Sequence, residues 1–132
     1  MSDTPAPSAV TYALDGTLAV VTLDDGKANA MGPAVVDDLT TALDRAEAEA
    51  TALVLVGGAK AFSAGFDLSV MTSSAEAMRD LVAAGGRFWM RLYGSPLPTV
   101  AACTGHALAG GALSLLAIDE RIGPSDAPAK IG

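Results

Sequence analysis

Two glycine-containing loops each follow a short apolar segment of the chain. One loop covers residues 57–68 and the other residues 104–111. Where a strand ends in such a loop, backbone amides are free to point at a ligand, and glycine lets an oxygen atom approach them closely. Two N–H groups converging from separate loops would form an oxyanion hole, which stabilises negative charge that develops on oxygen. The same spacing also fits two tight turns in a packed domain, so the loops alone leave both interpretations open.

Side chains that could act as nucleophiles or metal ligands give weaker signals. Cys103 and His106 lie near the second loop, but the sequence offers no third group to orient them. Ser63 partly resembles the serine of a nucleophile elbow, yet Ala61 stands where the first glycine belongs. One histidine and one cysteine are too few for a disulfide or a typical metal site. We therefore expect no bound metal.

Regular elements must position the two loops, and the first half of the chain contains recognisable ones. Strands are predicted at residues 10–14 and 17–23, joined by a type I′ turn at Asp15 and Gly16. Apolar residues at three- and four-residue spacing predict an amphipathic helix over residues 32–50. The apolar run at residues 51–56 then predicts a strand that is buried on both faces.

The second half continues this alternation of helices and strands. A helix is expected over residues 74–93, a strand over 99–103, a turn and a helix up to residue 117, and a strand over 119–122. The order predicts an α/β fold of stacked strand–helix units.

Composition and charge restrict the class of protein. Apolar residues make up 51% of the 132 residues and charged residues 17%, which is typical of a globular domain. The net charge of −7 and the lack of a basic run argue against nucleic acid as a partner. Residues 1–8 are polar and rich in proline, without a secretory signal, so we expect a flexible start, one domain over residues 9–132 and a cytoplasmic location.

One apolar segment, residues 97–118, is just long enough to cross a bilayer. Pro96 and Pro98 at its start, and three glycines inside it, argue against a membrane span. We favour a buried strand, a tight turn and a buried helix, and expect no membrane partner.

Three segments in order resemble the signatures of the crotonase family, the enoyl-CoA hydratase/isomerase superfamily. They are KANA at residues 27–30, AFSAGFDL at 61–68 and GHALAGGA at 105–112, and DERI at 119–122 resembles the family's following strand. The resemblance extends from about Val10 to Gly132. It implies a crotonase (ClpP-like) fold of stacked ββα units, of which this chain looks like the N-terminal part, so the fold is apparently truncated.

The resemblance also implies roles for single positions. Phe66 and Gly110 match the residues whose backbone N–H groups hold a thioester carbonyl. Lys27 lies where a basic residue can meet the nucleotide of coenzyme A, although Lys27 and Lys60 also fit as ordinary solvated lysines. Coenzyme A would be part of the substrate, and no separate cofactor is implied. The positions that match the groove for coenzyme A and its acyl chain are Ala28, Ala64, Asp67 and Leu68.

The chain departs from the family pattern at its acids. Family hydratases place a glutamate three residues after the second oxyanion glycine, and this position is Leu113, which cannot transfer a proton. The second family acid is expected just beyond Gly132. Asp119 and Glu120 are the nearest acids in sequence, but they fall on the following predicted strand and are not reassigned as the base.

Two functional hypotheses follow from the resemblance and its departures. The first is binding of an acyl-CoA thioester with enolate stabilisation, as in hydration or isomerisation of an enoyl-CoA in fatty-acid metabolism. The second is a non-catalytic acyl-CoA-binding or scaffold homologue that has lost the glutamate base. Under either hypothesis the resemblance implies a homo-oligomer, a trimer or hexamer in full-length family members.

Overall fold

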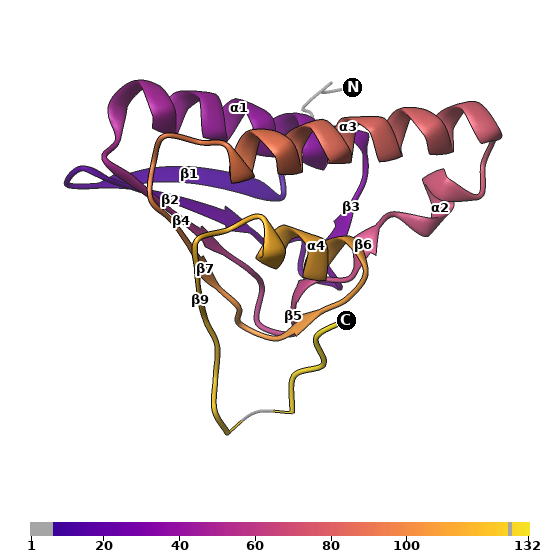
Figure 1. Ribbon diagram of the computed structural model, residues 1–132. Helices are drawn as coiled ribbons and strands as arrows, with labels where there is room; N and C mark the ends of the chain where they lie inside the picture. Colours follow the sequence, from indigo (N-terminus) through magenta and orange to yellow (C-terminus); the bar gives the residue numbers. More distant parts are fainter. Residues whose placement is uncertain (1–6, 127) are drawn as a thin grey trace, which may run out of the picture.

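A five-stranded sheet carries two long helices on one face in the computed structural model, which describes residues 7–126 and 128–132 (Figure 1). The strands follow the order β1 (Val10–Asp15), β2 (Leu18–Leu23), β4 (Ala52–Val56), β7 (Thr99–Ala102) and β9 (Glu120–Ile122). β1 runs antiparallel to β2, and the other neighbours are parallel. The predicted alternation of strands and helices is confirmed.

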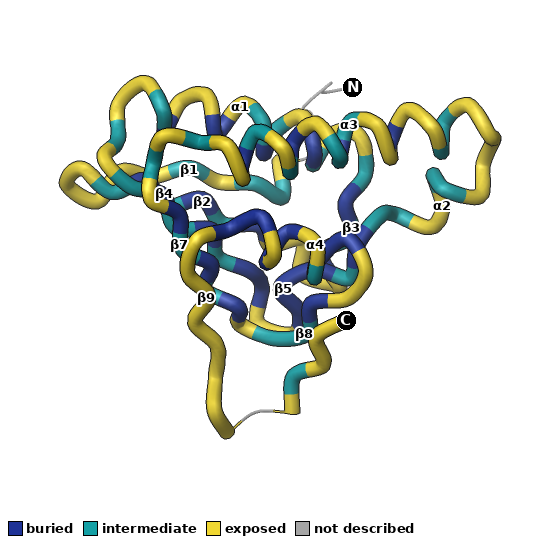
Figure 2. The backbone as a smooth tube through the Cα atoms, in the orientation of Figure 1, coloured by how far each residue is buried: buried dark blue, intermediate teal, exposed yellow. Residues whose placement is uncertain are grey.

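The two long helices, α1 (Pro33–Glu49) and α3 (Ala75–Tyr93), bury one side each against the sheet (Figure 2). Their buried residues recur every three or four positions, which keeps them on one helix face. In α1 these residues are Val36, Leu39, Ala42, Leu43 and Ala46, and in α3 they are Leu81, Gly85, Phe88 and Leu92.

The loops between these elements contain short structured pieces that the sequence pattern did not predict. Two small parallel pairs form there, and a four-residue helix follows the first of them. The pairs are β3 (Ala30–Met31) with β6 (Gly65–Phe66) and β5 (Ala61–Ser63) with β8 (His106–Ala107), and the four-residue helix is α2 (Leu68–Met71). Helix α4 (Gly110–Leu116), beside them, confirms the helix predicted up to residue 117. Pairings of two or three residues leave too little hydrophobic periodicity to be recognised.

The turn between β1 and β2 differs from the prediction. Asp15 pairs with Leu18, so the two central residues of the turn are Gly16 and Thr17, and Gly16 alone has a positive φ, of 62°. A positive φ at the first central position only is the pattern of a type II′ turn, in which glycine is favoured at that position. The hairpin is therefore confirmed, but the predicted type I′ turn at Asp15 and Gly16 is wrong.

The prediction that residues 51–56 are buried on both faces is also wrong. Leu53 and Leu55 are 3% and 6% exposed beneath the helices, whereas Val54 on the opposite face is only partly buried. The same alternation occurs in β2, where Val21 is buried and Val20 is not. The reason is that α1 and α3 both lie on one face of the sheet.

The apolar segment at residues 97–118 forms β7, β8 and α4, so the predicted strand and helix are confirmed. The helix is buried on one side only, since Leu113 and Leu116 are exposed. Within the described parts of the chain, no helix is long and apolar enough to cross a membrane. The expected flexible start falls largely on residues 1–6, which lie outside the described residues. Ser8, which is described, donates a hydrogen bond from its hydroxyl to Asp38 at 2.7 Å.

The difference between the two sheet faces can be tested with one substitution at two neighbouring valines. Val21→Thr places a hydroxyl in the core and should lower the free energy of unfolding by about 1–3 kcal/mol. Val20→Thr faces the open side and should change it by less than about 0.5 kcal/mol, because threonine suits a half-exposed strand. Equal losses in denaturant unfolding would show that both faces are covered.

Candidate functional site

The two glycine-containing loops meet where β6 lies against the start of α4. A Cβ atom placed on Gly65 would lie 2.9 Å from the amide nitrogen of Gly110, and one placed on Gly110 would lie 3.3 Å from the Cα of Gly65. Gly65 also has a φ of 92°, which strains any residue with a side chain. Because the amide of Phe66 follows Gly65 directly, the two expected N–H donors, from Phe66 and Gly110, lie close together.

The hydrogen bonds of neighbouring residues indicate where these two amides point. Asp67 donates its N–H to the Met31 carbonyl of β3 at 3.0 Å. Successive N–H groups along an extended strand point to opposite sides, so the N–H of Phe66 points away from β3. Gly110 is the first residue of α4, where an N–H has no acceptor within the helix. Both amides are thus placed to donate outside their own elements.

The residue before Gly110 has a strained backbone. Ala109 has φ 50° and ψ −115°, a conformation that residues with a Cβ atom rarely adopt. Such strain costs about 1–3 kcal/mol and is concentrated at functional sites. The strain at Ala109 therefore agrees with a functional role for the turn that presents the Gly110 N–H.

Helix α3 supports both sides of this arrangement. The ring of Phe66 packs against Gly85, where a Cβ atom would lie 2.5 Å from the ring. The same ring lies 5.4 Å from the ring of Trp89, measured between centroids. Trp89 donates its Nε1–H to Ser114 at 2.9 Å, and the Ser114 hydroxyl donates to the carbonyl of Gly110 at 2.9 Å. One helix thus contacts Phe66 directly and reaches Gly110 through Trp89.

The residues expected to line a substrate groove lie around the same loops. The N–H of Ala64 donates to the carbonyl of Ala28 at 2.9 Å, which brings the first and second signatures together. Lys27 is exposed beside Ala28, and the side chain of Leu68 at the start of α2 is 75% exposed. The structure therefore places Lys27, Ala28 and Ala64 in one region, with Leu68 open to solvent.

Asp67 has a structural task that the sequence pattern did not indicate. Its carboxylate accepts hydrogen bonds from the hydroxyl of Ser69 at 2.6 Å and from the N–H of Ser69 at 2.9 Å, which makes it the N-cap of α2. The hydroxyl of Ser69 contributes most to holding the pKa of Asp67 below its usual value. The carboxylate is therefore ionised at neutral pH and turned toward α2.

The side chains considered for other chemistry bond to the backbone in the structure. The Cys103 thiol donates to the carbonyl of Gly105 at 3.3 Å, and burial raises the pKa of Cys103, which disfavours a reactive thiolate. His106 accepts a hydrogen bond at Nδ1 from the N–H of Lys130 at 3.0 Å. Asp119 accepts one from the N–H of Thr99 at 2.9 Å. None of these contacts forms a nucleophile–base pair.

Leu113 lies one turn into α4, three residues after Gly110, and is 46% exposed. It presents only hydrocarbon at the position where the family pattern has an acid. Among residues 7–126 and 128–132, no group of three or more histidine, cysteine, aspartate or glutamate side chains could hold a metal ion.

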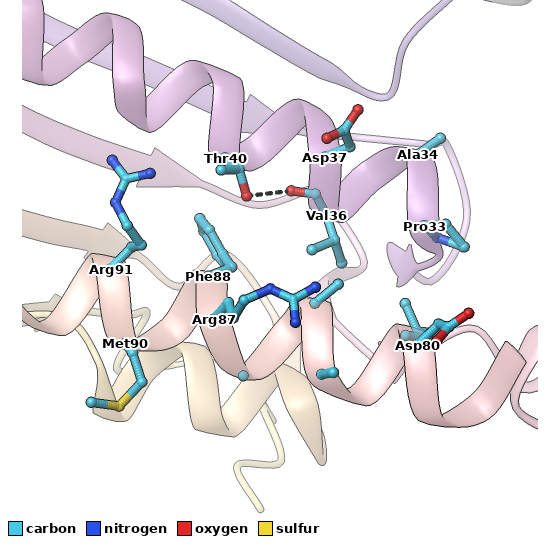
Figure 3. Close-up of a pocket in the computed structure, with 14 residues that line it drawn as sticks. Pro33, Ala34, Val36, Asp37, Thr40, Asp80, Arg87, Phe88, Met90 and Arg91 are labelled. Atoms are coloured by element: carbon cyan, nitrogen blue, oxygen red, sulfur yellow. Dashed lines mark hydrogen bonds between the residues drawn. The ribbon is translucent and has the colours of Figure 1, made fainter. Parts of the chain in front are cut away.

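A large open groove of about 1050 Å³ lies elsewhere, between α1 and α3 (Figure 3). Its floor is apolar, with Val36 and Phe88, and it carries charged groups such as Asp80 and Arg87. None of the residues expected to form the site lines this groove. The candidate site therefore rests on the loop geometry and not on the size of a cavity.

The contact between Phe66 and α3 predicts opposite effects of one substitution at two adjacent glycines. Gly86→Ala meets nothing within 4 Å, so the better helix propensity of alanine should raise the free energy of unfolding by up to about 1 kcal/mol. Gly85→Ala pushes the Phe66 ring out of place and should lower it by about 1–3 kcal/mol. If denaturant unfolding shows both variants to be stabilised alike, Phe66 does not depend on α3.

Comparison with known proteins agrees with this arrangement of loops. A family model described as enoyl-CoA hydratase/isomerase matches residues 14–129. A protein from Bacillus subtilis described as a probable enoyl-CoA hydratase is 32% identical over 124 residues, which cover 91% of this chain and 48% of that protein.

Two solved structures are also similar. An enoyl-CoA hydratase/isomerase family protein from Pseudomonas syringae is 45% identical with a TM-score of 0.85, covering 87% of this chain and 50% of that one. An enoyl-CoA isomerase from Mycobacterium tuberculosis is 41% identical with a TM-score of 0.82, covering 86% of this chain and 50% of that one. This chain spans about half the length of the relatives it matches. With this fold and these ordered signatures, the chain belongs to the enoyl-CoA hydratase/isomerase family, the crotonase superfamily.

Proposed function

We propose that the chain binds an acyl-CoA thioester and holds the carbonyl oxygen between the backbone N–H groups of Phe66 and Gly110. The observation that carries the proposal is the close approach of Gly65 to Gly110, which brings these two amides together. Two donors aimed at one oxygen would stabilise the negative charge of an enolate. Membership of the family supports an acyl-CoA ligand.

We further propose that Lys27 meets the phosphates of coenzyme A, which is a polyanion that an acidic protein must bind through local cations. Ala28, Ala64, Asp67 and Leu68 would line the groove for coenzyme A and the acyl chain. The contact between Ala64 and Ala28 supports this assignment for two of the four positions. Coenzyme A enters as part of the substrate, and no separate cofactor is proposed.

The reaction that best fits the family is hydration or isomerisation of an enoyl-CoA. The similar proteins include one described as a probable hydratase and one described as an isomerase. Leu113 favours the second hypothesis, a non-catalytic acyl-CoA-binding or scaffold homologue, because a leucine cannot activate water. A homo-oligomeric state, a cytoplasmic location and a place in fatty-acid metabolism stay predictions from the resemblance.

The oxyanion hole is tested by the infrared carbonyl stretch of a bound acyl-CoA labelled at the thioester carbon. The stretch should shift to lower frequency on binding, and Gly110→Pro should abolish most of this shift, because proline has no N–H. Loss of one such donor typically costs about 3 kcal/mol of transition-state stabilisation. Proline is tolerated at the first position of a helix, but its Cβ would lie 3.2 Å from the Trp89 ring, so circular dichroism must show that α4 still forms.

Phe66→Ala is the matched control, because it removes a side chain but keeps the backbone N–H. It also removes the ring contacts with Gly85 and Trp89, so it should reduce the carbonyl shift of the bound fraction, but less than Gly110→Pro does. A native chain that binds acyl-CoA without any carbonyl shift would refute the oxyanion hole.

The lack of an acid at Leu113 predicts the outcome of a direct assay. Addition of water to crotonyl-CoA by the purified chain should be near background, measured by loss of the enoyl thioester absorbance. Robust turnover that persists in Glu120→Gln would contradict this account and would reveal a base elsewhere in the chain.

A further inference from the structure

Ser63 is a buried serine that the proposed function leaves without a task. It is 2% exposed and lies at the end of β5. Its hydroxyl donates to the carbonyl of Asn29 at 2.8 Å and accepts from the N–H of Gly65 at 3.1 Å. Its carbonyl accepts from the N–H of Leu108 at 2.9 Å. The hydroxyl is therefore occupied as both donor and acceptor, which argues against a nucleophile.

These bonds connect Ser63 to both segments that carry the proposed N–H donors. Gly65 directly precedes Phe66, and Leu108 lies two residues before Gly110. The start of α4 also packs closely against Ser63, since a Cβ atom placed on Gly111 would lie 2.1 Å from the Ser63 carbonyl oxygen. A shift of Ser63 would therefore move the two segments relative to each other.

The partner of the Ser63 hydroxyl is itself held firmly. Asn29 is fully buried, and its side-chain amide donates to the carbonyls of Leu23, Ala61 and Phe62 at 2.7, 3.2 and 3.2 Å. Its φ of 56° lies in the left-handed region. A continuous path of hydrogen bonds thus runs from the end of β2 through Asn29 and Ser63 to Gly65.

We propose that Ser63 is a positioning residue that sets the distance between the N–H donors of Phe66 and Gly110. This inference rests on the proposed function, because it names the residue on which the geometry of that site depends. Ser63 touches neither the thioester nor a reacting atom and acts only through Gly65 and Leu108. A misplacement of about 1 Å is enough to impair a site of this kind, by up to about 100-fold in rate.

The test compares two variants that each remove one buried hydroxyl. Ser63→Ala removes the hydrogen bonds that the hydroxyl makes to Asn29 and Gly65. Thr99→Val removes the hydrogen bonds that its hydroxyl makes to Asp119. Thr99 lies at the beginning of β7, at the opposite end of the strand from the loop that leads to Gly110. Both should lower stability. Only Ser63→Ala should reduce and broaden the carbonyl shift of bound, labelled acyl-CoA.

Hydrogen exchange of the free protein gives a second readout that needs no ligand. Loss of a hydrogen bond worth about 1 kcal/mol should speed exchange of the Gly65 N–H by local opening about fivefold in Ser63→Ala. In Thr99→Val the local-opening rate of this amide, measured under conditions where global unfolding does not contribute, should stay as in the native chain. If Ser63→Ala does not fold, Ser63→Cys replaces it, because a thiol is larger than a hydroxyl but still a weak donor and acceptor, and it should give a smaller loss.

The outcomes separate the two proposals. A full carbonyl shift and unchanged Gly65 exchange in the Ser63 variants would overturn the role of Ser63 while leaving the oxyanion hole intact. The role is also overturned if Thr99→Val loses the shift to the same extent. If bound acyl-CoA shows no carbonyl shift in the native chain, the oxyanion hole itself is refuted. If the Gly65 N–H then also exchanges at the native rate in Ser63→Ala, the positioning role of Ser63 is refuted as well.

Discussion

The site depends on the close approach of two backbone segments, at Gly65 and Gly110. A Cβ atom on Gly65 would lie 2.9 Å from the Gly110 nitrogen, which leaves no room for a side chain there, and one on Gly110 would be tightly restricted at 3.2 Å from the Trp89 ring. Backbone amides are well suited to bind a developing oxyanion because they are held by the fold and need not reorganise during the reaction. The chemistry proposed for this chain is thus carried by main-chain geometry.

The rest of the molecule fixes this geometry from two directions. On one side, short parallel pairings and the bonds of Asn29 and Ser63 connect the loops to the end of the main sheet. On the other side, α3 packs against Phe66 and is linked to Gly110 through Trp89. Helix α3 is held in turn by α1, for example by the ion pair between Arg91 and Asp44 at 2.7 Å. These contacts therefore hold in place the two segments that carry the proposed donors.

Much of this architecture could be predicted from the sequence, and the misses have physical reasons. The long helices and main strands have clear periodicity, so they were predicted to within a few residues. The β3–β6 and β5–β8 pairs and helix α2 were missed because pieces of two to four residues carry no periodic signal. The prediction that β4 is buried on both faces failed because hydrophobicity alone does not tell on which side of a sheet the helices lie.

The candidate site, too, could be predicted from the sequence only in part. Phe66 and Gly110 could be named from ordered signatures, but their proximity requires long-range contacts that only the fold supplies. The role of Asp67 as the cap of α2 depends on where Ser69 turns, which no motif specifies. The links from Asn29 to Ser63 join residues 34 positions apart, and the sequence carried no sign of them.

The most direct measurement of the central claim is a titration of the isotopically labelled chain with crotonyl-CoA, followed by the amide proton resonances in NMR spectra. The account predicts that the amide protons of Phe66 and Gly110 move downfield together and with one affinity, because both begin to donate to the same carbonyl oxygen. Saturable binding that shifts other resonances but leaves these two amides unmoved would contradict it.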